Sequence, residues 1–256
     1  MAARAAKQRA DVLAVVQGLA ETRARAQALI LAGKLFSGAQ RIDKPGTLLT
    51  ADTELSLSRP DHPWVSRGGL KLAHALEAFG LSPARLVCLD IGASTGGFTD
   101  VLLAAGAARV HAVDVGHGQL AWKLRTDPRV VVHERTNARY LDAATIGETA
   151  QVLVCDASFI GLATLLPAPL ALCAPGAWAV ALIKPQFEAG RDLVGGKGVV
   201  RDPAVHAAVC ARVRAWWSSL DGWRVLGIAP SPITGPEGNR EFLIAALRED
   251  IGPGVP

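Results

Sequence analysis

The chain has 256 residues, of which 50% are hydrophobic and 20% are charged, and its formal net charge is +4 at pH 7. This composition supplies enough apolar residues for one medium-sized core and a small second domain, which excludes an intrinsically disordered protein. The cysteines show no C-x-x-C spacing, so we expect reduced thiols, a cytoplasmic location and no bound metal. They are Cys88, Cys155, Cys173 and Cys210.

The basic excess lies in the first sixty residues, which contain nine Lys or Arg and five Asp or Glu, whereas residues 61–256 contain 18 of each kind. A basic segment joined to a neutral one indicates a polyanionic partner, most simply nucleic acid, although a solvated basic face explains the charge equally well. The short apolar run at residues 12–19 argues against a signal peptide. Because Pro167, Pro169 and Pro175 interrupt the uncharged stretch 162–183, we expect a helix, a turn and a buried strand there rather than a membrane span.

Two short helices are predicted first, one over residues 12–18 and one over residues 23–32, with Thr22 as the N-cap of the second and Gly33 at its end. Short strand-like pieces separated by turns follow. This order predicts a compact α+β domain that binds RNA over residues 1–58, then a stiff linker over residues 59–66 and a second domain over residues 67–248. The residues predicted to contact RNA are Arg4, Lys7, Arg23, Arg25, Lys34, Arg41, Lys44 and, farther along the chain, Arg67.

The second domain is organised around a strand, a glycine turn, a helix and another strand between Cys88 and Gly116. The first apolar run ends at Gly92, a helical apolar pattern ends at Gly106, and the second apolar run ends at Asp114. A glycine turn lets the backbone approach a ligand closely, and the N-terminus of the helix presents free N–H groups to it. Asp114 stands where a carboxylate reaches the two hydroxyls of a bound ribose.

Three chemistries compete for this turn. A dinucleotide-binding G-x-G-x-x-G motif requires glycine where the chain has Ser94, and Asp90 at the end of the first strand would repel a pyrophosphate. Asp90 suits a cationic ligand such as S-adenosylmethionine. Residues 92–96 also fit the G-x-S-x-G pattern of a hydrolase, but no earlier strand is predicted that would supply an oxyanion hole. We therefore prefer adenosylmethionine over a nicotinamide dinucleotide, over a hydrolase, and over a turn without a ligand.

Strands and helices alternate through the rest of the domain, which predicts a mainly parallel sheet with ligands at the carboxyl ends of its strands. Asp114, Asp156 and Lys184 fall at such ends. Taken alone, Lys71 is explained by a solvated lysine and Glu241 by an edge-strand carboxylate. Strands are predicted over residues 86–91, 130–133, 151–156, 177–184, 223–229 and 241–247, and helices over residues 67–79 and 204–220.

Two lysines and two carboxylates together can promote methyl transfer from a sulfonium to a weak nucleophile such as a ribose hydroxyl. The reaction is an in-line displacement, so the enzyme positions the reactants and removes the proton of the acceptor. A lysine has an ordinary pKa of about 10.4, and burial beside a second ammonium lowers the pKa toward that of a useful base. Two other methyltransferase classes fit less well. Asp156 is not followed by the Pro-Pro-aromatic run of an amine methyltransferase, and the Cys155 side chain is expected to face away from the substrate, unlike a carbon-5 nucleophile.

Several segments carry a family resemblance. The segments VSRGGLKL, LDIGASTGGFTDVLL, VDVGHGQLAWKLR, ERTNAR, DASFI, IKPQFEAGR, GVVRDPAVH and SPITGPEGNREFL resemble the TlyA (haemolysin-A-like) family within the FtsJ-like ribose methyltransferases. Residues 9–58, especially ETRARAQALILAGKL and KPGTLL, are similar to the alpha-L RNA-binding module first known from a ribosomal protein.

The resemblance implies a Rossmann-like class I methyltransferase sheet, mostly parallel and seven-stranded, with S-adenosylmethionine as cofactor. It implies 2'-O-methylation of a cytidine in ribosomal RNA of the large subunit, and in some members of the small subunit, so the expected partners are ribosomal RNA or ribosomal subunits and no membrane. The family's Lys-Asp-Lys-Glu set corresponds to Lys71, Asp156, Lys184 and Glu241, with Lys184 as base. In addition to Asp90, the cofactor positions are Gly92, Ser94, Gly96, Gly97, Asp114 and, on the adenine side, Asn137. One departure is His117 in the expected pocket wall, where family members carry tyrosine.

Residues 190–202 are rich in glycine and charge. They nearly fit a phosphate-binding loop, but Gly196 stands where that loop has lysine, so we expect a mobile lid over the RNA, or a surface loop without a role. Two functions from other classes stay open. One is a pore-forming haemolysin, against which the lack of an unbroken apolar span argues. The other is an RNA-binding protein with a vestigial enzyme domain, against which the filled strand-end positions argue.

Overall fold

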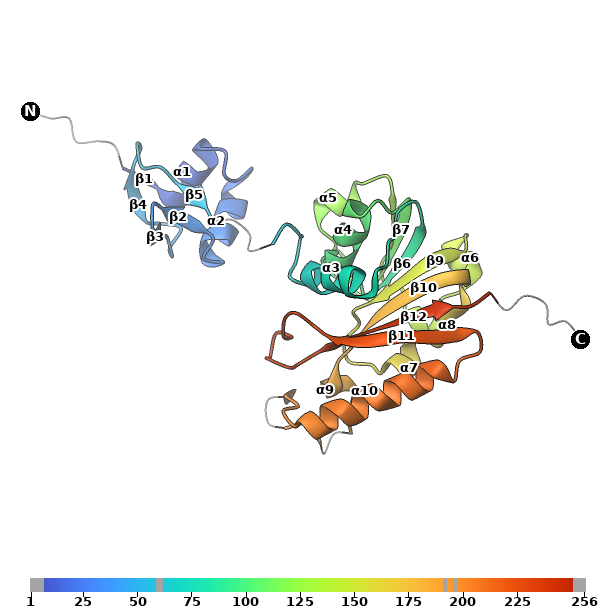
Figure 1. Cartoon of the computed structure of the whole chain (residues 1–256). Helices are drawn as coiled ribbons and strands as arrows, with labels where there is room; N and C mark the ends of the chain where they lie inside the picture. Colours follow the sequence, from blue (N-terminus) through green and yellow to red (C-terminus); the bar gives the residue numbers. More distant parts are fainter. Residues whose placement is uncertain (1–6, 59–61, 191–192, 196–197, 251–256) are drawn as a thin grey trace, which may run out of the picture. The chain divides into compact units, whose positions relative to one another are not determined.

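A computed structural model describes residues 7–58, 62–190, 193–195 and 198–250. The chain divides into two compact units, Met1–Pro63 and Trp64–Pro256 (Figure 1). Trp64 and Val65 therefore belong to the second unit, although the sequence places them in the linker. The reason is local packing, because a Cβ on Gly69 would lie 2.3 Å from Trp64 Cγ and the Val65 amide donates to Asp100 Oδ2 at 2.8 Å.

The described part of the first unit has two short helices and two small antiparallel sheets, in which β1 pairs with β4 and β2 pairs with β3 and β5. Leu13, Ile30 and Leu35 are fully buried in its core. The predicted N-cap is confirmed, since Thr22 Oγ1 accepts a hydrogen bond from the Arg25 amide at 3.2 Å. The elements are β1 (Lys7–Arg9), α1 (Ala10–Val16), α2 (Arg23–Leu31), β2 (Leu35–Ser37), β3 (Gln40–Arg41), β4 (Leu48–Thr50) and β5 (Ser56–Leu57).

The second unit is built on a seven-stranded sheet, which confirms the expected mostly parallel architecture. In spatial order the strands are β11 (Trp223–Pro230), β12 (Phe242–Arg248), β10 (Cys173–Ile183), β9 (Ala150–Cys155), β6 (Val87–Ile91), β7 (Arg109–Val113) and β8 (Val130–His133). The five strands from β10 to β8 pair in parallel, and β12 is antiparallel to both of its neighbours. Because β12 runs in the opposite direction, its first residue, Phe242, pairs with Ile183 at the end of β10. The residue before β12 is thereby brought to the edge where the parallel strands end.

Helices cover both faces of this sheet (Figure 1). One face packs against α3 (Gly68–Phe79), α4 (Gly97–Ala104) and α5 (Trp122–Arg125). The other face packs against η1 (Ala138–Tyr140), α6 (Ala143–Ile146), α7 (Leu162–Leu165), α8 (Pro167–Ala171) and α10 (Pro203–Ser218), with α9 (Pro185–Glu188) beside α10. The uncharged stretch 162–183 forms α7, α8 and β10, as expected. Among the residues that the structure describes, no helix has the length and hydropathy to cross a bilayer.

Side chains along β9 alternate between the two faces. Val152 and Val154 lie in the core under α3 and α4, whereas Leu153 and Cys155 lie in the core under α7, α8 and α10. This alternation confirms that Cys155 faces away from the α3 side of the sheet, toward which the next residue, Asp156, projects.

Candidate active site

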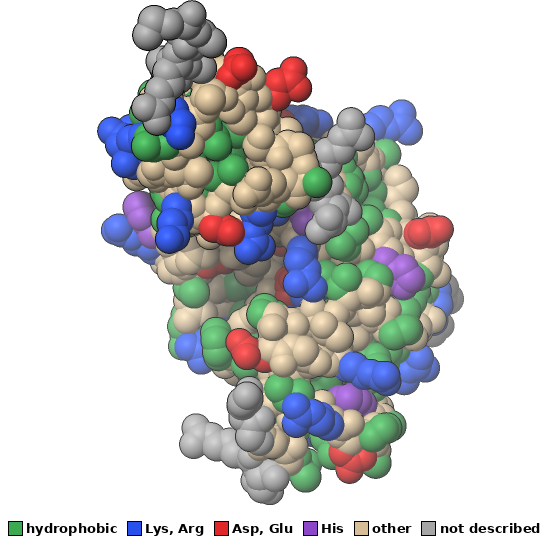
Figure 2. All heavy atoms as spheres, turned by 90° about the vertical axis from the view of Figure 1, so that its left-hand side faces the viewer, with side chains coloured by type: hydrophobic (Ala, Val, Ile, Leu, Met, Phe, Trp, Pro, Cys, Tyr) green, Lys and Arg blue, Asp and Glu red, His purple; other side chains and the backbone are tan. Residues whose placement is uncertain are grey.

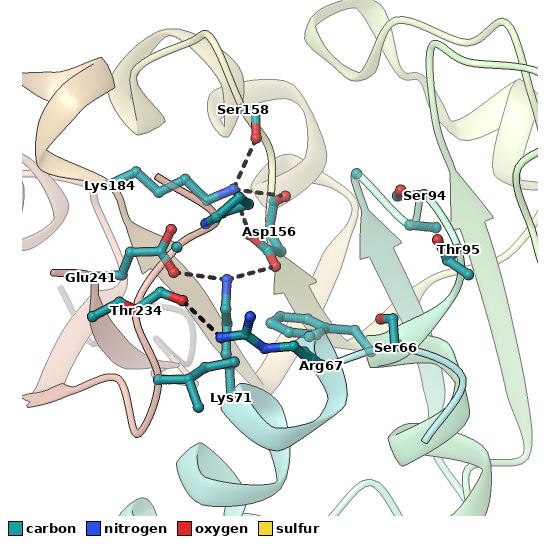
Figure 3. A pocket seen from close by; sticks show the side chains of 18 residues that line it. Ser66, Arg67, Lys71, Ser94, Thr95, Asp156, Ser158, Lys184, Thr234 and Glu241 are labelled. Atoms are coloured by element: carbon teal, nitrogen blue, oxygen red, sulfur yellow. Dashed lines mark hydrogen bonds and ion pairs between the residues drawn. The ribbon is translucent and has the colours of Figure 1, made fainter. Parts of the chain in front are cut away.

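Four charged side chains from separate elements meet beyond the ends of β9 and β10 (Figure 3). Lys71 belongs to α3, Asp156 follows β9, Lys184 follows β10, and Glu241 precedes β12. Lys71 Nζ lies 2.7 Å from Glu241 Oε2 and 3.4 Å from Asp156 Oδ2. Lys184 Nζ lies 2.6 Å from Asp156 Oδ1. The four groups form one chain of ion pairs in which Asp156 links the two amines.

These charges are largely removed from solvent. The exposed fraction of the side chain is 8% for Lys71, 9% for Lys184, 18% for Asp156 and 1% for Glu241. Charges buried to this degree require partners of opposite sign, and two ammonium groups with two carboxylates supply them. Gly235 makes room for the cluster, because a Cβ there would lie 2.7 Å from Glu241 Oε1.

The glycine turn between β6 and α4 lies against the residues that follow β9. Gly92 has φ of +80°, and a Cβ there would lie 3.0 Å from the Ala157 Cα, so this close approach requires glycine. Ser94 also has a left-handed backbone, with φ of +49°. Its amide donates to Asp114 Oδ2 at 2.8 Å, and the Gly116 amide donates to Asp114 Oδ1 at 2.7 Å. Asp114 therefore holds the turn against the end of β7.

Two cavities meet at this turn. The larger, of about 630 Å³, extends from the turn to Asp114 and Asn137, and the smaller, of about 360 Å³, contains the four charged side chains. Their adjacency means that a molecule bound in one lies next to a molecule bound in the other. The residues that line both cavities are Gly92, Ser94, Asp156 and Ser158.

The remaining predicted cofactor positions differ in where they lie. Gly97 lines the smaller cavity, whereas Gly96, with φ of +97°, lines neither cavity and packs so closely on Leu124 that a Cβ would lie 2.3 Å from that side chain. Asp90 is fully buried and also lines neither cavity, because the alternation of β6 directs its side chain toward α4, where Thr99 Oγ1 donates to Asp90 Oδ2 at 2.6 Å. Burial raises the pKa of Asp90 to about 7. Asp90 therefore lies outside both cavities, whereas the sequence-based expectation placed it beside the cofactor.

His117 also lies away from the cavities. Its side chain is 63% exposed, and its Nε2 is 3.6 Å from Glu134 Oε2. His117 is thus on the surface and not in the cavity wall where the sequence analysis expected it.

A family model described as FtsJ-like methyltransferase matches residues 64–248. The chain belongs to the FtsJ-like methyltransferase family. It is 50% identical to YqxC of Bacillus subtilis, over 93% of this chain and 85% of that protein. It is 48% identical to the 16S/23S rRNA (cytidine-2'-O)-methyltransferase TlyA of Mycobacterium tuberculosis, over 94% of this chain and 90% of that protein. A solved structure of a Streptococcus thermophilus protein named as a hemolysin superposes with a TM-score of 0.73 at 45% identity, over 96% of this chain and 90% of that one. The predicted kinship with TlyA proteins and the expected enzyme class, a methyltransferase, are confirmed.

In this FtsJ-like methyltransferase Cys155 is unsuited to attack a base carbon. Its thiol is fully buried on the sheet face opposite α3, and burial raises the pKa of Cys155 to about 12. A thiolate nucleophile requires the opposite environment, exposed and with a lowered pKa. The structure therefore agrees with the sequence in disfavouring a carbon-5 methyltransferase.

Sequence reasoning missed Ser158. Lys184 Nζ donates to Ser158 Oγ at 2.9 Å, and Ser158 is exposed at the rim that both cavities share. Its position two residues after Asp156 placed it near the strand end. The sequence did not reveal the conformation of the turn after Asp156, in which Phe159 adopts a left-handed φ of +67°.

The basic residues predicted to contact RNA lie on the surface where they are described. Arg4 is outside the described residues. Arg23 Nε lies 2.9 Å from the buried Asp11, and Arg41 Nε lies 2.6 Å from Asp43, so these two guanidinium groups already have carboxylate partners. Arg67 lines the smaller cavity of the methyltransferase unit. On the face drawn in Figure 2, Lys and Arg side chains are spread among uncharged ones. The exposed predicted residues are Lys7, Arg23, Arg25, Lys34, Arg41, Lys44 and Arg67.

Part of the glycine-rich segment 190–202 is anchored next to the active site. Asn239 Oδ1 accepts from the Val200 amide at 3.0 Å, and Asn239 Nδ2 donates to the Gly198 carbonyl at 3.0 Å. His206 Nε2 lies 3.0 Å from the Val200 carbonyl oxygen. Residues 191–192 and 196–197 lie outside the described residues, so the lid stays a prediction.

Proposed function

We propose that this protein transfers a methyl group from S-adenosylmethionine to the 2'-hydroxyl of a cytidine in ribosomal RNA. The observation that carries the proposal is the convergence of Lys71, Asp156, Lys184 and Glu241 where two cavities meet. Reaction between two bound molecules requires adjoining sites that align them. The M. tuberculosis relative is named for this reaction on 16S and 23S rRNA, which supports the RNA assignment. We place the large subunit first and the small subunit second.

The larger cavity fits S-adenosylmethionine. Each carboxylate oxygen of Asp114 accepts one backbone N–H and keeps a lone pair that can accept from a ribose hydroxyl. Asn137 Oδ1 accepts from the Arg139 amide at 3.1 Å, which leaves the Asn137 amide nitrogen to donate to an adenine nitrogen. Gly92 leaves the strand end open, since it adds no side chain to the cavity wall. The bound cofactor supplies a methyl group on a positively charged sulfur, which is an electrophile.

Lys184 is the proposed general base. In its neutral form the amine accepts the proton of the ribose hydroxyl as the oxygen attacks the methyl carbon, which is the chemistry that a weak acceptor requires. Asp156 Oδ1, at 2.6 Å from Nζ, stabilises the ammonium that forms. Lys71 is held between Glu241 and Asp156, so we assign it a positioning role, in which it fixes the Asp156 carboxylate.

We propose that the first unit is an alpha-L-like domain that binds the RNA, with residues 1–58 as its extent. Its described part combines two short helices with small sheets and exposes Lys7, Arg25, Lys34 and Lys44, for which no carboxylate within salt-bridge distance is found among the described residues. Such amines can bind phosphate oxygens without first breaking an ion pair.

The test is to incubate the full chain and radiolabelled S-adenosylmethionine with separate large and small ribosomal subunits, then to identify the labelled nucleoside. We expect 2'-O-methylcytidine. The Lys184→Ala variant should lose transfer and retain cofactor binding measured by calorimetry, whereas Arg214→Ala, an exposed change outside both cavities, should behave as the wild type. Label on a base atom would contradict the hydroxyl chemistry. RNA binding without cofactor binding would instead support an RNA-binding protein with an inactive enzyme domain.

A further inference from the structure

Ser158 is the exposed partner of a buried lysine (Figure 3). Lys184 Nζ lies within hydrogen-bond distance of Asp156 Oδ1 at 2.6 Å, Ser158 Oγ at 2.9 Å and the Asp156 carbonyl oxygen at 3.4 Å. The amine donates hydrogen bonds to Ser158 Oγ and to the Asp156 carbonyl oxygen and forms an ion pair with Asp156 Oδ1, so these three oxygens surround Nζ. A substrate hydroxyl that transfers its proton to Lys184 must therefore displace or act through one of the three.

The three oxygen partners are not equivalent. An ionised carboxylate and a backbone carbonyl only accept hydrogen bonds, whereas a hydroxyl both donates and accepts. Of these partners, Ser158 is therefore the one that can donate a proton to a neutral Lys184 amine and take another proton in its place. Its geometry already suits the exchange, because 2.9 Å is an ordinary hydrogen-bond length in either direction.

The location of Ser158 makes it accessible to the reactants. The side chain is exposed and lines both cavities, whereas the Lys184 side chain is 9% exposed. Phe159, directly after it, has a left-handed φ of +67°, a backbone conformation that is uncommon outside glycine and is concentrated at functional sites. A molecule bound at the junction of the two cavities can therefore contact the Ser158 hydroxyl, which lies beside the less exposed Lys184 amine.

We propose that Ser158 relays the proton from the ribose 2'-hydroxyl to Lys184, an inference that rests on the proposed methyl transfer. As the oxygen–methyl bond forms and the sulfur–methyl bond breaks, the 2'-hydroxyl proton moves to Ser158 Oγ. The original hydroxyl proton of Ser158 moves to the neutral Lys184 Nζ at the same time. Serine is regenerated, Lys184 becomes an ammonium beside Asp156, and water later removes that proton.

The relay distinguishes the two lysines of the cluster. Lys71 Nζ contacts two carboxylates, Glu241 and Asp156, and among the described residues it has no hydroxyl partner. Lys184 has such a partner and Lys71 has not, which agrees with one lysine accepting the proton and the other holding a carboxylate in place.

The experiment compares wild type, Ser158→Ala and Ser158→Thr under single-turnover conditions, with labelled S-adenosylmethionine and the ribosomal subunit that the wild type modifies. Ser158→Ala should lower the rate of transfer about 10²-fold, which is within the usual contribution of a proton-transferring group. Calorimetry should show unchanged cofactor binding. Ser158→Thr retains a hydroxyl and should keep most of the rate. Rates in mixtures of H₂O and D₂O should curve with deuterium fraction for the wild type, where two protons move together, and should be linear for Ser158→Ala.

Each other outcome has a separate meaning. A wild-type rate in Ser158→Ala overturns the relay. A slow Ser158→Ala variant that keeps the wild-type curvature, or a Ser158→Thr variant as slow as alanine, also overturns it, because the serine then only positions Lys184. If the wild type methylates no ribose hydroxyl on either subunit, the proposed function itself fails, and this result appears before any variant is tested.

Discussion

Replacing Asp90 with asparagine should make the stability of the second unit less dependent on pH. Asp90 is fully buried, and burial, together with the nearby Asp156 and Asp114, raises its pKa to about 7 even though Thr99 donates a hydrogen bond to it. In the unfolded chain the pKa of the same carboxyl group is about 3.9. Between these two values the folded state binds a proton that the unfolded state does not, so the free energy of unfolding falls as the pH rises. The slope is about 1.4 kcal/mol per pH unit, which gives a loss of about 2 to 3 kcal/mol between pH 5 and pH 8.

Urea unfolding followed by tryptophan fluorescence measures this effect in the second unit. Every tryptophan of the chain lies there, at Trp64, Trp122, Trp178, Trp216, Trp217 and Trp223. Asparagine keeps an oxygen that accepts from Thr99 and has no proton to release, while other ionisable groups contribute equally to both proteins. The wild type should therefore lose about 2 to 3 kcal/mol more than Asp90→Asn between pH 5 and pH 8. Equal pH dependence in the two proteins would refute the raised pKa.

Two further changes test the packing and the chemistry of the same unit. Gly97→Ala places a Cβ 2.3 Å from Ser66 Oγ and 2.9 Å from the Gly69 backbone nitrogen. It should therefore lower the free energy of unfolding by about 1–3 kcal/mol in the urea assay. Unchanged stability would contradict the close packing of α3 on α4. Cys155→Ala removes a buried thiol on the sheet face opposite α3 and should retain methyl transfer in the single-turnover assay. A folded Cys155→Ala variant without transfer would point to a thiol nucleophile.

The sheet and its strand-end residues were predictable because apolar runs and glycine turns are local signals. The runs that end at Gly92, Asp114 and Asp156 end where strands end in the structure. Parallel strands bring such ends to one edge, so the proximity of Asp156 and Lys184 followed from the pattern. Glu241 is different, since it directly precedes a strand, and it reaches the same edge because β12 is antiparallel. Strand direction depends on long-range pairing, so this placement came from the family resemblance and not from periodicity.

Other features were beyond the sequence because they depend on which atoms meet across the fold. The side chain of Asp90 was expected at the ligand, but the alternation of β6 turns it toward Thr99 under α4. Trp64 was assigned to the linker because its segment contains Pro60 and Pro63 and shows no periodic pattern of apolar residues. In the structure its side chain packs on Gly69, a tertiary contact that the sequence pattern does not reveal. The hydrogen bond between Ser158 Oγ and Lys184 Nζ could be identified only from the structure.

The charged cluster is difficult to explain by stability alone. Buried ion pairs often stabilise a fold no more than apolar residues of the same volume, because desolvation offsets the attraction. Removing one partner leaves an uncompensated buried charge at a cost of about 3–5 kcal/mol. Asp156 serves both Lys71 and Lys184, so its loss leaves the Lys184 amine without any carboxylate within salt-bridge distance among the described residues. If stability were the only requirement, apolar side chains would serve as well at these positions. The proposed proton transfer at the junction of the two cavities instead requires amines that carboxylates hold at fixed positions. The arrangement therefore favours the proposed methyl transfer over a purely stabilising role. Loss of activity in a variant that lacks one of the four charges tests this role only when the variant unfolds in urea like the wild type.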